Sequence, residues 1–251
     1  MVVGRKLKAW LGLPLIPLLL GAAPPDPRLT TLREGGEGPP TLVFLHGYGS
    51  SAEHWHPFVQ ALAGPPSARF IFPQAAKKMT RRDGGLGARA WWPLDFKKGA
   101  RPNGAGADLA LDHPKGLARS SREISAILHA ERSTEDPPII LGGFSQGAMV
   151  ACQIAFTTEE PLSALVILSG TGINRAAWKQ RMAFRKGLRV FMAHGREDAV
   201  LPFDMAERLR DDLVAAGMAV TFVPFTGGHE MPAEVVTALR EFLGWKKEAA
   251  P

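Results

Sequence analysis

Short runs of apolar residues alternate with longer amphipathic segments along most of the chain. Six runs are apolar at odd and even positions alike, which is typical of strands buried on both faces of a sheet. These predicted strands are Thr41–Leu45, Arg69–Phe72, Ile139–Leu141, Ala164–Leu168, Leu188–Ala193 and Val220–Val223. Because helical patterns separate them, we predict an α/β fold with a mostly parallel central sheet and helices on both faces.

Several segments between these strands carry apolar residues on one face and charges on the other, as surface helices do. The clearest covers Phe203–Ala216 and is followed by Gly217, which favours a helix end. Ser120 and Glu123 form a capping box, which predicts a helix start at this point. A final helix is expected over residues 232–244, because Pro begins this segment and Gly ends it.

Two stretches interrupt the alternation of strands and helices. Residues 26–40 are rich in Pro and Gly, and we expect a linker there with one edge strand around residues 29–33. The α/β domain is expected over residues 41–247, with an irregular insertion at about 74–116 that contains Trp91 and Trp92. A long irregular insertion in a compact domain usually belongs to a functional loop or is disordered.

The first 25 residues form an apolar segment with the order of a secretory signal peptide: basic residues, a short uncharged run and then small residues. The run is too short for a membrane span, which needs roughly 20 apolar residues. Pro14 and Pro17 interrupt a helix there, so an apolar arm packed on the domain is the alternative. We favour export, to the periplasm or outside the cell, over a cytoplasmic location.

Composition narrows the class of protein. The chain has 251 residues, of which 45% are hydrophobic and 22% charged, so a sizeable core is available and global disorder is excluded. The single cysteine, Cys152, excludes an internal disulfide and a multi-cysteine metal site, and we expect it to be a small buried apolar residue. The net charge of +6 favours anionic partners, but no nucleic-acid-binding motif accompanies it.

The sequence Gly143-x-Ser145-x-Gly147 lies between an apolar strand and a helical run. A sharp turn from strand to helix strains the backbone at the serine, and only small residues two positions away avoid clashes. Such a turn lifts the hydroxyl clear of the sheet and places the positive end of the following helix beside it. We predict that Ser145 is a nucleophile; the alternative is a glycine-lined turn with an incidental serine.

A serine hydroxyl needs a base, and the base needs an orienting acid. Two later loops, each directly after a predicted strand, supply these groups in the order serine, acid, histidine that accompanies this kind of turn. His229 is the expected base and Asp198 the expected acid, with Glu197 as a rival and helix capping as the alternative role of Asp198. All follow predicted strands, at the sheet edge where open α/β sheets bind ligands.

Other histidines fit the role of base less well. His46 precedes the serine in the chain and is expected to shape a loop, while His194 is expected to pack behind the acid loop. His54 and His56 have a spacing that suggests metal, but no third ligand lies near them in the sequence. We therefore expect no metal and no cofactor.

Acyl transfer also needs hydrogen-bond donors where negative charge develops on the carbonyl oxygen. One expected donor is the backbone N–H of Gln146, the residue after the serine. The glycine-rich loop at residues 46–49 follows the first central strand and allows the backbone to approach a substrate closely. The N–H of Tyr48 is the expected second donor, and a simple turn is the alternative for this loop.

Five segments of the chain, in order, resemble the phospholipase/carboxylesterase family, which includes acyl-protein thioesterases. They are Phe44–Gly49, Leu141–Ala148, Leu168–Gly170, His194–Asp198 and Gly228–Glu230. The similarity covers about residues 40–244. It implies an α/β-hydrolase fold, a cofactor-free serine esterase or thioesterase, and oxyanion donors at Tyr48 and Gln146.

The resemblance also implies that Trp91 or Trp92, ahead of Asp95, lies on a loop beside the substrate. The chain departs from many relatives in its apolar N-terminal extension and in a basic, glycine-rich loop at residues 77–106. Tyr48 stands where the eukaryotic thioesterases have an aliphatic residue. These departures concern the substrate and the compartment rather than the chemistry.

The predicted activity is hydrolysis of carboxylic esters or thioesters of small to medium acyl groups through an acyl-enzyme. A lipase or polyester depolymerase is the first alternative, and a non-catalytic binding module is the second. Trp91, Trp92 and Phe144 are candidate walls of an apolar substrate pocket, with Trp55 as a further candidate and core packing as the alternative for each. Basic residues at 77–89 would allow weak contact with an anionic surface, or form a solvated loop face.

Overall fold

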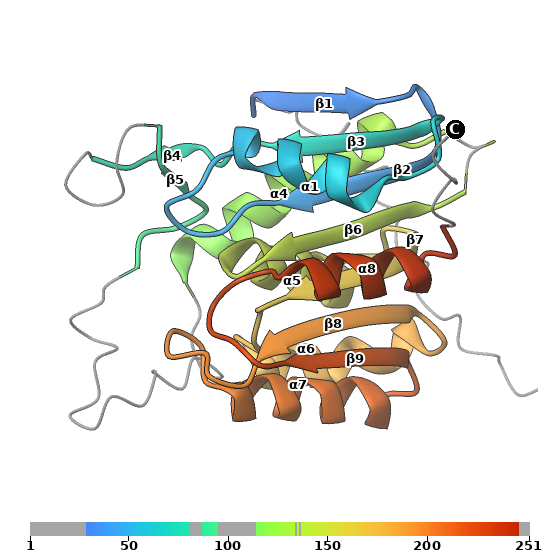
Figure 1. The fold of residues 1–251 in the computed structure, drawn as a ribbon. Coiled ribbons are helices and arrows are strands. Elements are labelled where there is room, and N and C mark those ends of the chain that lie inside the picture. The colour runs from blue at the N-terminus through green and yellow to red at the C-terminus, as the bar shows by residue number, and fades with distance from the viewer. Residues whose placement is uncertain (1–28, 81–86, 95–113, 134, 136, 246–251) are drawn as a thin grey trace, which may run out of the picture.

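A seven-stranded sheet runs through the middle of the described part of the chain (Figure 1). The computed structural model describes residues 29–80, 87–94, 114–133, 135 and 137–245. In spatial order the strands are β1 (Thr31–Gly35), β3 (Ala68–Pro73), β2 (Gly38–Leu45), β6 (Ile139–Phe144), β7 (Leu162–Leu168), β8 (Arg189–Gly195) and β9 (Ala219–Phe225). Only β1 is antiparallel to its neighbour in this sheet, so the predicted mostly parallel sheet is confirmed.

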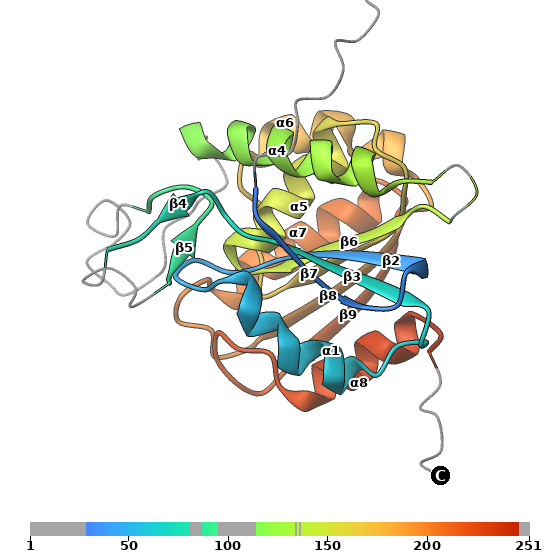
Figure 2. The same ribbon diagram turned by 90° about the horizontal axis from the view of Figure 1, so that it is seen from above.

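Helices cover both faces of the sheet (Figure 2). One face carries α4 (Lys115–Glu131), α5 (Gln146–Thr157), α6 (Arg175–Met182) and α7 (Phe203–Ala215), with the short turn η3 (Ala183–Arg185) after α6. The other face carries η1 (Ala52–Trp55), α1 (His56–Leu62) and α8 (Ala233–Phe242). In β7, Leu165 and Ile167 join the first apolar cluster and Val166 and Leu168 the second, which explains the apolar residues at both parities.

All six predicted strands form, each one to three residues longer than its apolar run, and β8 begins one residue later than predicted, at Arg189. The prediction of a helix start at Ser120 is wrong, because α4 begins at Lys115, directly after Pro114. Ser120 is buried in the middle of this helix, and its hydroxyl donates a hydrogen bond to the carbonyl oxygen of Trp91 at 2.9 Å. The serine therefore holds a distant segment rather than its own helix end.

The stretch expected to be a linker is partly in the sheet. β1 pairs with β3 along its whole length, and β2 starts at Gly38, so residues 31–35 and 38–40 belong to strands rather than to a connection. In the expected insertion, β4 (Lys77–Lys78) and β5 (Arg89–Ala90) form a small antiparallel ribbon. Residues 81–86 and 95–113 of the insertion, with Asp95, lie outside the described residues. The same holds for residues 1–28, where the signal peptide was predicted.

The chain order of the strands reverses between β2 and β6. From β2 the chain passes through α1 to β3 on one side, and it then returns through α4 to β6 on the other side of β2. In open α/β sheets the carboxyl ends of strands at such a reversal diverge and leave a crevice for ligands. The loop after β2 and the turn after β6 both lie at this point, so the fold places residues 46–50 and 145–147 where a ligand is expected to bind.

Candidate active site

Ser145 lies at the turn between β6 and α5 in a backbone conformation that non-glycine residues rarely adopt, with φ 54° and ψ −118°. Glycines permit the tight packing around it. A Cβ on Gly143 would lie 2.5 Å from a backbone atom of Gly147, and a Cβ on Gly147 would lie 2.1 Å from the carbonyl oxygen of Leu45. The turn therefore has the strained geometry that the sequence predicts, and it presses the start of α5 against the end of β2.

The hydroxyl of Ser145 contacts an imidazole that in turn contacts a carboxylate. The distance from Ser145 Oγ to His229 Nε2 is 2.8 Å, and that from His229 Nδ1 to Asp198 Oδ2 is 2.7 Å. With the Nδ1 proton held by the carboxylate, Nε2 accepts the hydrogen bond that the serine hydroxyl donates. The three residues come from the ends of β6, β8 and β9, which are far apart in the sequence. Glu197, the rival acid, is exposed.

The environment of Asp198 keeps its carboxylate ionised. Burial raises the pKa of Asp198, but hydrogen bonds from His194, His229 and the N–H of Leu201 outweigh it and hold this pKa well below its usual range. The second carboxylate oxygen accepts the N–H groups of Val200 and Leu201, both at 2.8 Å. Both N–H groups belong to the loop before α7, which begins at Phe203 without a side-chain cap, so the helix-capping alternative does not describe this carboxylate.

His194 lies behind the acid loop, as expected, and also touches the carboxylate. Its Nε2 lies 2.8 Å from the carbonyl oxygen of Leu201 and 3.2 Å from Asp198 Oδ2. Both of these partners are acceptors, so Nε2 carries a proton. The loops with Asp198 and His229 are further tied by main-chain bonds, from Arg196 to Phe225 and from Glu197 to Gly227. The site is therefore held by contacts on both sides of the carboxylate.

The loop after β2 packs directly against the serine turn. A Cβ on Gly47 would lie 3.0 Å from the Phe144 ring and 3.4 Å from Cβ of Ser145. His46 is buried in this loop, with Nδ1 2.8 Å from the carbonyl oxygen of Gly47, while its Nε2 accepts the N–H of Ala75 at 3.2 Å. Burial lowers the pKa of His46 to about 4, so its ring is neutral and donates through Nδ1. As expected, His46 shapes the loop.

Trp91 and Trp92, two of the candidate pocket walls, do not line the cavity beside Phe144 that is described next. They are 5% and 3% exposed and belong to the apolar core on the α5 side of the sheet. Their main chain is bound by the side chain of Gln146: Oε1 accepts the N–H of Trp91, and Nε2 donates to the carbonyl oxygen of Trp92, both at 2.9 Å. Core packing, the alternative stated for each, describes them.

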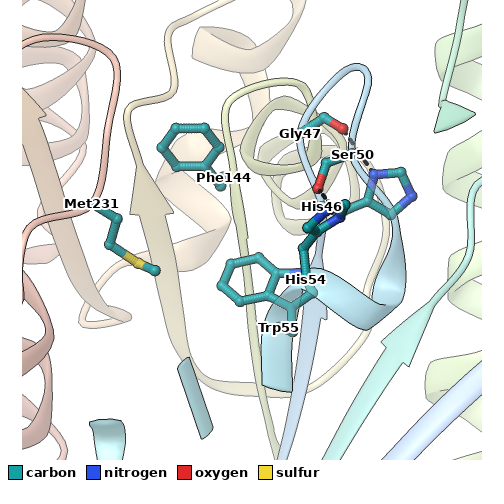
Figure 3. A pocket seen from close by; sticks show the side chains of 7 residues that line it. All are labelled: His46, Gly47, Ser50, His54, Trp55, Phe144 and Met231. Atoms are coloured by element: carbon teal, nitrogen blue, oxygen red, sulfur yellow. Dashed lines mark hydrogen bonds between the residues drawn. The ribbon is translucent and has the colours of Figure 1, made fainter. Parts of the chain in front are cut away.

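A cavity of about 160 Å³ lies beside Phe144, the residue before Ser145 (Figure 3). It is lined by His46, Gly47, Ser50, His54, Trp55, Phe144 and Met231. Phe144 also packs against the ring of His229, with 4.9 Å between ring centres. Sequence reasoning missed Ser50 and Met231 as lining residues, although Ser50 follows the glycine-rich loop and Met231 stands two positions after His229.

The remaining candidate residues have structural surroundings. His54 Nδ1 lies 3.2 Å from Ser50 Oγ and 3.1 Å from Ser51 Oγ, and His56 pairs with Glu34. Within the described ranges, no group of three or more His, Cys, Asp or Glu residues could hold a metal ion. Cys152 is fully buried in α5, and burial raises the pKa of its thiol well above the usual range.

A serine at a strained strand-to-helix turn, in contact with an imidazole and a carboxylate at the carboxyl edge of a parallel sheet, is typical of serine hydrolases with the α/β-hydrolase fold. Comparison with known proteins gives the same class. The chain belongs to the phospholipase/carboxylesterase family, whose model matches residues 32–246. It is a serine hydrolase that acts on ester or thioester bonds.

Curated relatives and solved structures agree with this assignment. Acyl-protein thioesterase 1 of Mycosarcoma maydis is 30% identical over 188 residues, which cover 72% of this chain and 78% of the relative. Acyl-protein thioesterase 1 of Neurospora crassa is 26% identical, with coverage of 81% and 85%. The crystal structure of esterase PE8 has a TM-score of 0.72 at 25% identity, covering 86% of this chain and 98% of that one. Acyl-protein thioesterase 2 of Zea mays has the same fold, with a TM-score of 0.64 at 24% identity and coverage of 87% and 98%.

The preference for export is wrong on this comparison, because the acyl-protein thioesterase relatives are cytosolic enzymes. A short apolar run after basic residues matches a signal peptide in outline only, since Pro14 and Pro17 interrupt it. In the part of the chain that the structure describes, no helix has both the length and the apolar character to cross a bilayer.

Proposed function

We propose that Ser145 attacks the acyl carbon of an ester or thioester, with His229 as general base and Asp198 as the orienting acid. The supporting observation is the pair of contacts at 2.8 Å and 2.7 Å that joins hydroxyl, imidazole and carboxylate. The serine proton passes to His229 Nε2 as the new carbon–oxygen bond forms. Asp198 holds the imidazole in the required tautomer and stabilises the imidazolium that results.

The same imidazolium then protonates the departing alcohol or thiol, which leaves an acyl-enzyme on Ser145. Water repeats the sequence: His229 takes its proton, the hydroxyl attacks the acyl carbon, and Ser145 recovers its proton as the acid leaves. In each half the carbonyl oxygen carries negative charge for a moment. The backbone N–H groups of Tyr48 and Gln146 are the proposed donors to this oxyanion.

Two features support those donors. Gln146 is the first residue of α5, where N–H groups have no partner within the helix and the helix dipole favours an anion. Tyr48 belongs to the loop that packs on the serine turn through Gly47. A donor from each segment would approach the same oxygen from two directions.

The cavity beside Phe144 is the proposed acyl site. At about 160 Å³ it is smaller than the roughly 300–1,000 Å³ of pockets for drug-sized ligands, which favours small to medium acyl groups. Trp55, Phe144 and Met231 supply apolar surface, while Ser50 and His54 give one side a polar rim. Hydrolysis of small to medium acyl esters or thioesters is the function that this geometry supports best.

A serine substitution tests the central assignment. Ser145→Ala is expected to lower kcat for p-nitrophenyl butyrate by at least about 10⁴-fold and to abolish labelling by a fluorophosphonate, because no other group receives the acyl chain. Ser67→Ala, which changes an exposed serine on another surface, is the matched control and is expected to keep both. Labelling or turnover that persists in Ser145→Ala would defeat the proposed mechanism.

A further inference from the structure

Trp91 connects two segments that carry the proposed oxyanion donors. Its indole Nε1 donates to the carbonyl oxygen of His46 at 2.8 Å, and its backbone N–H donates to Gln146 Oε1 at 2.9 Å. The first contact reaches the loop after β2, and the second reaches the first residue of α5. One residue thus binds both sides of the site from the core beneath them.

Further hydrogen bonds fix Trp91 itself. Ser120 of α4 donates to its carbonyl oxygen at 2.9 Å, and Gln146 Nε2 donates to the next carbonyl, that of Trp92, at 2.9 Å. The tryptophan ring also packs on the ring of His46, with 5.2 Å between ring centres. Because these groups are buried, water cannot replace a lost partner, and the network favours a single arrangement.

The contact with His46 bears on the peptide that carries one donor. His46 Nδ1 donates to the carbonyl oxygen of Gly47, which belongs to the same planar peptide unit as the N–H of Tyr48. A fixed carbonyl direction therefore fixes the direction of that N–H. Trp91 holds the backbone of His46, and through it the orientation of this peptide.

We propose that Trp91 is a positioning residue that sets the separation of the two oxyanion donors, through its indole on the Tyr48 side and its backbone on the Gln146 side. This inference rests on the proposed function, since it assumes that these two N–H groups bind the oxyanion. It assigns the buried tryptophan a role in the chemistry although it does not touch the substrate. We call Trp91, with its bonds to His46, Gln146 and Ser120, the Trp91 brace.

The test removes the indole donor and keeps an aromatic ring. Trp91→Phe is expected to lower kcat for p-nitrophenyl butyrate by about 10- to 100-fold while KM stays within about 2-fold. The reason is that misplaced donors weaken the binding of the charged transition state much more than the binding of the uncharged ester. The inhibition constant of butylboronic acid, which forms a tetrahedral adduct on the serine, is expected to rise by a similar factor.

Trp178→Phe is the matched control. Its indole is also buried and donates to Gln153 Oε1 at 2.7 Å, but it lies on α6, away from the loop after β2. It is expected to lower the Tm as much as Trp91→Phe while kcat and boronate affinity stay at the wild-type values. An equal loss of kcat in both variants would show a general structural effect and overturn the proposal.

Gln146→Met provides a second approach that does not depend on Trp91→Phe folding. It removes the bonds to Trp91 and Trp92 but keeps the backbone N–H and most of the side-chain volume, and the same split between kcat and KM is expected. Wild-type kcat and boronate affinity in Gln146→Met would overturn the brace, as would such values in a folded Trp91→Phe. If Ser145→Ala is inactive in that case, only the brace fails; if Ser145→Ala is active, the proposed function fails.

Discussion

The two sides of Ser145 are built in opposite ways. On the α5 side, buried Trp91 donates to Gln146 and to the His46 carbonyl, and Gln146 donates to the Trp92 carbonyl, through hydrogen bonds of 2.9 Å or less that leave little room for movement. On the α1 and α8 side, Phe144 and the half-buried Met231 line an open cavity with exposed His54 at its rim (Figure 3). A change on the first side should alter the chemical step, and a change on the second should alter which acyl group is accepted.

This contrast has a physical cause. Reacting groups must be held within a fraction of an ångström, so they are best placed on strand ends and locked by buried polar contacts. An acyl chain is held by non-directional apolar contact, which tolerates side chains of different size and direction. The fixed side is therefore costly to alter, whereas the pocket wall can vary with little effect on folding.

The largest expected effect comes from the acid on the fixed side. Asp198→Asn is expected to lower kcat by about 10⁴-fold, since the amide can still accept the N–H groups of Val200 and Leu201 but no longer holds the His229 tautomer that receives the serine proton. Steady-state hydrolysis of p-nitrophenyl butyrate measures it. Glu197→Gln, a change at the exposed neighbour, should leave kcat as in the wild type, and a similar loss there would return Glu197 to the role of acid.

The next effect concerns stability and the buried ring of His46. Burial lowers its pKa in the folded state to about 4, against 6.5 in the unfolded chain, so the unfolded state takes up the proton first as the pH falls. The free energy of unfolding is expected to decrease between pH 6.5 and about 4, by about 3 kcal/mol in total, and to receive no contribution from His46 above that window.

Urea unfolding across this pH range measures the decrease. His46→Asn should remove that part of the pH dependence, because it removes the titrating ring while keeping a side-chain donor. His129→Gln, at an exposed histidine on α4, is the matched control substitution. Equal slopes in the wild type and His46→Asn would contradict a buried neutral ring at this position.

The smallest expected effect lies on the pocket side. Met231→Trp should narrow the cavity and lower the ratio of kcat/KM for p-nitrophenyl hexanoate to that for the acetate by about 10-fold, while Met231→Ala should raise it. Trp92→Phe is the control on the fixed side, and it should leave this ratio unchanged even where kcat falls. If Trp92→Phe changed this ratio of kcat/KM values and Met231→Trp did not, the side of Ser145 that selects the acyl group would be the opposite of the one expected.

Local pattern was sufficient for much of the fold. The strands were predicted because runs that are apolar at both parities are typical of strands buried on both faces, and the serine turn because the glycines two positions before and after Ser145 leave room for a sharp bend. Asp198 and His229 followed from the order serine, acid, histidine that accompanies this turn and from their places after predicted strands, since the carboxyl ends of parallel strands share one edge. Ser120 was misread because its partner, the carbonyl oxygen of Trp91, is 29 residues away.

By itself, the sequence determined the strands and the strained turn, because each depends on neighbours within a few positions of the chain. The order of the serine, acid and histidine could also be read from it, but their contacts form only in the folded chain, since Ser145 and His229 are 84 residues apart. Only the tertiary structure decided which aromatic side chains face a cavity. Trp91 and Trp92 are buried, and the side chain of Gln146 binds their main chain. Trp55 and Met231 both line the cavity beside Phe144, although they are more than 170 residues apart in the sequence. The same aromatic residue types occur in a protein core and in the wall of a pocket. Which of the two a given ring occupies depends on whether the folded chain packs other side chains against it.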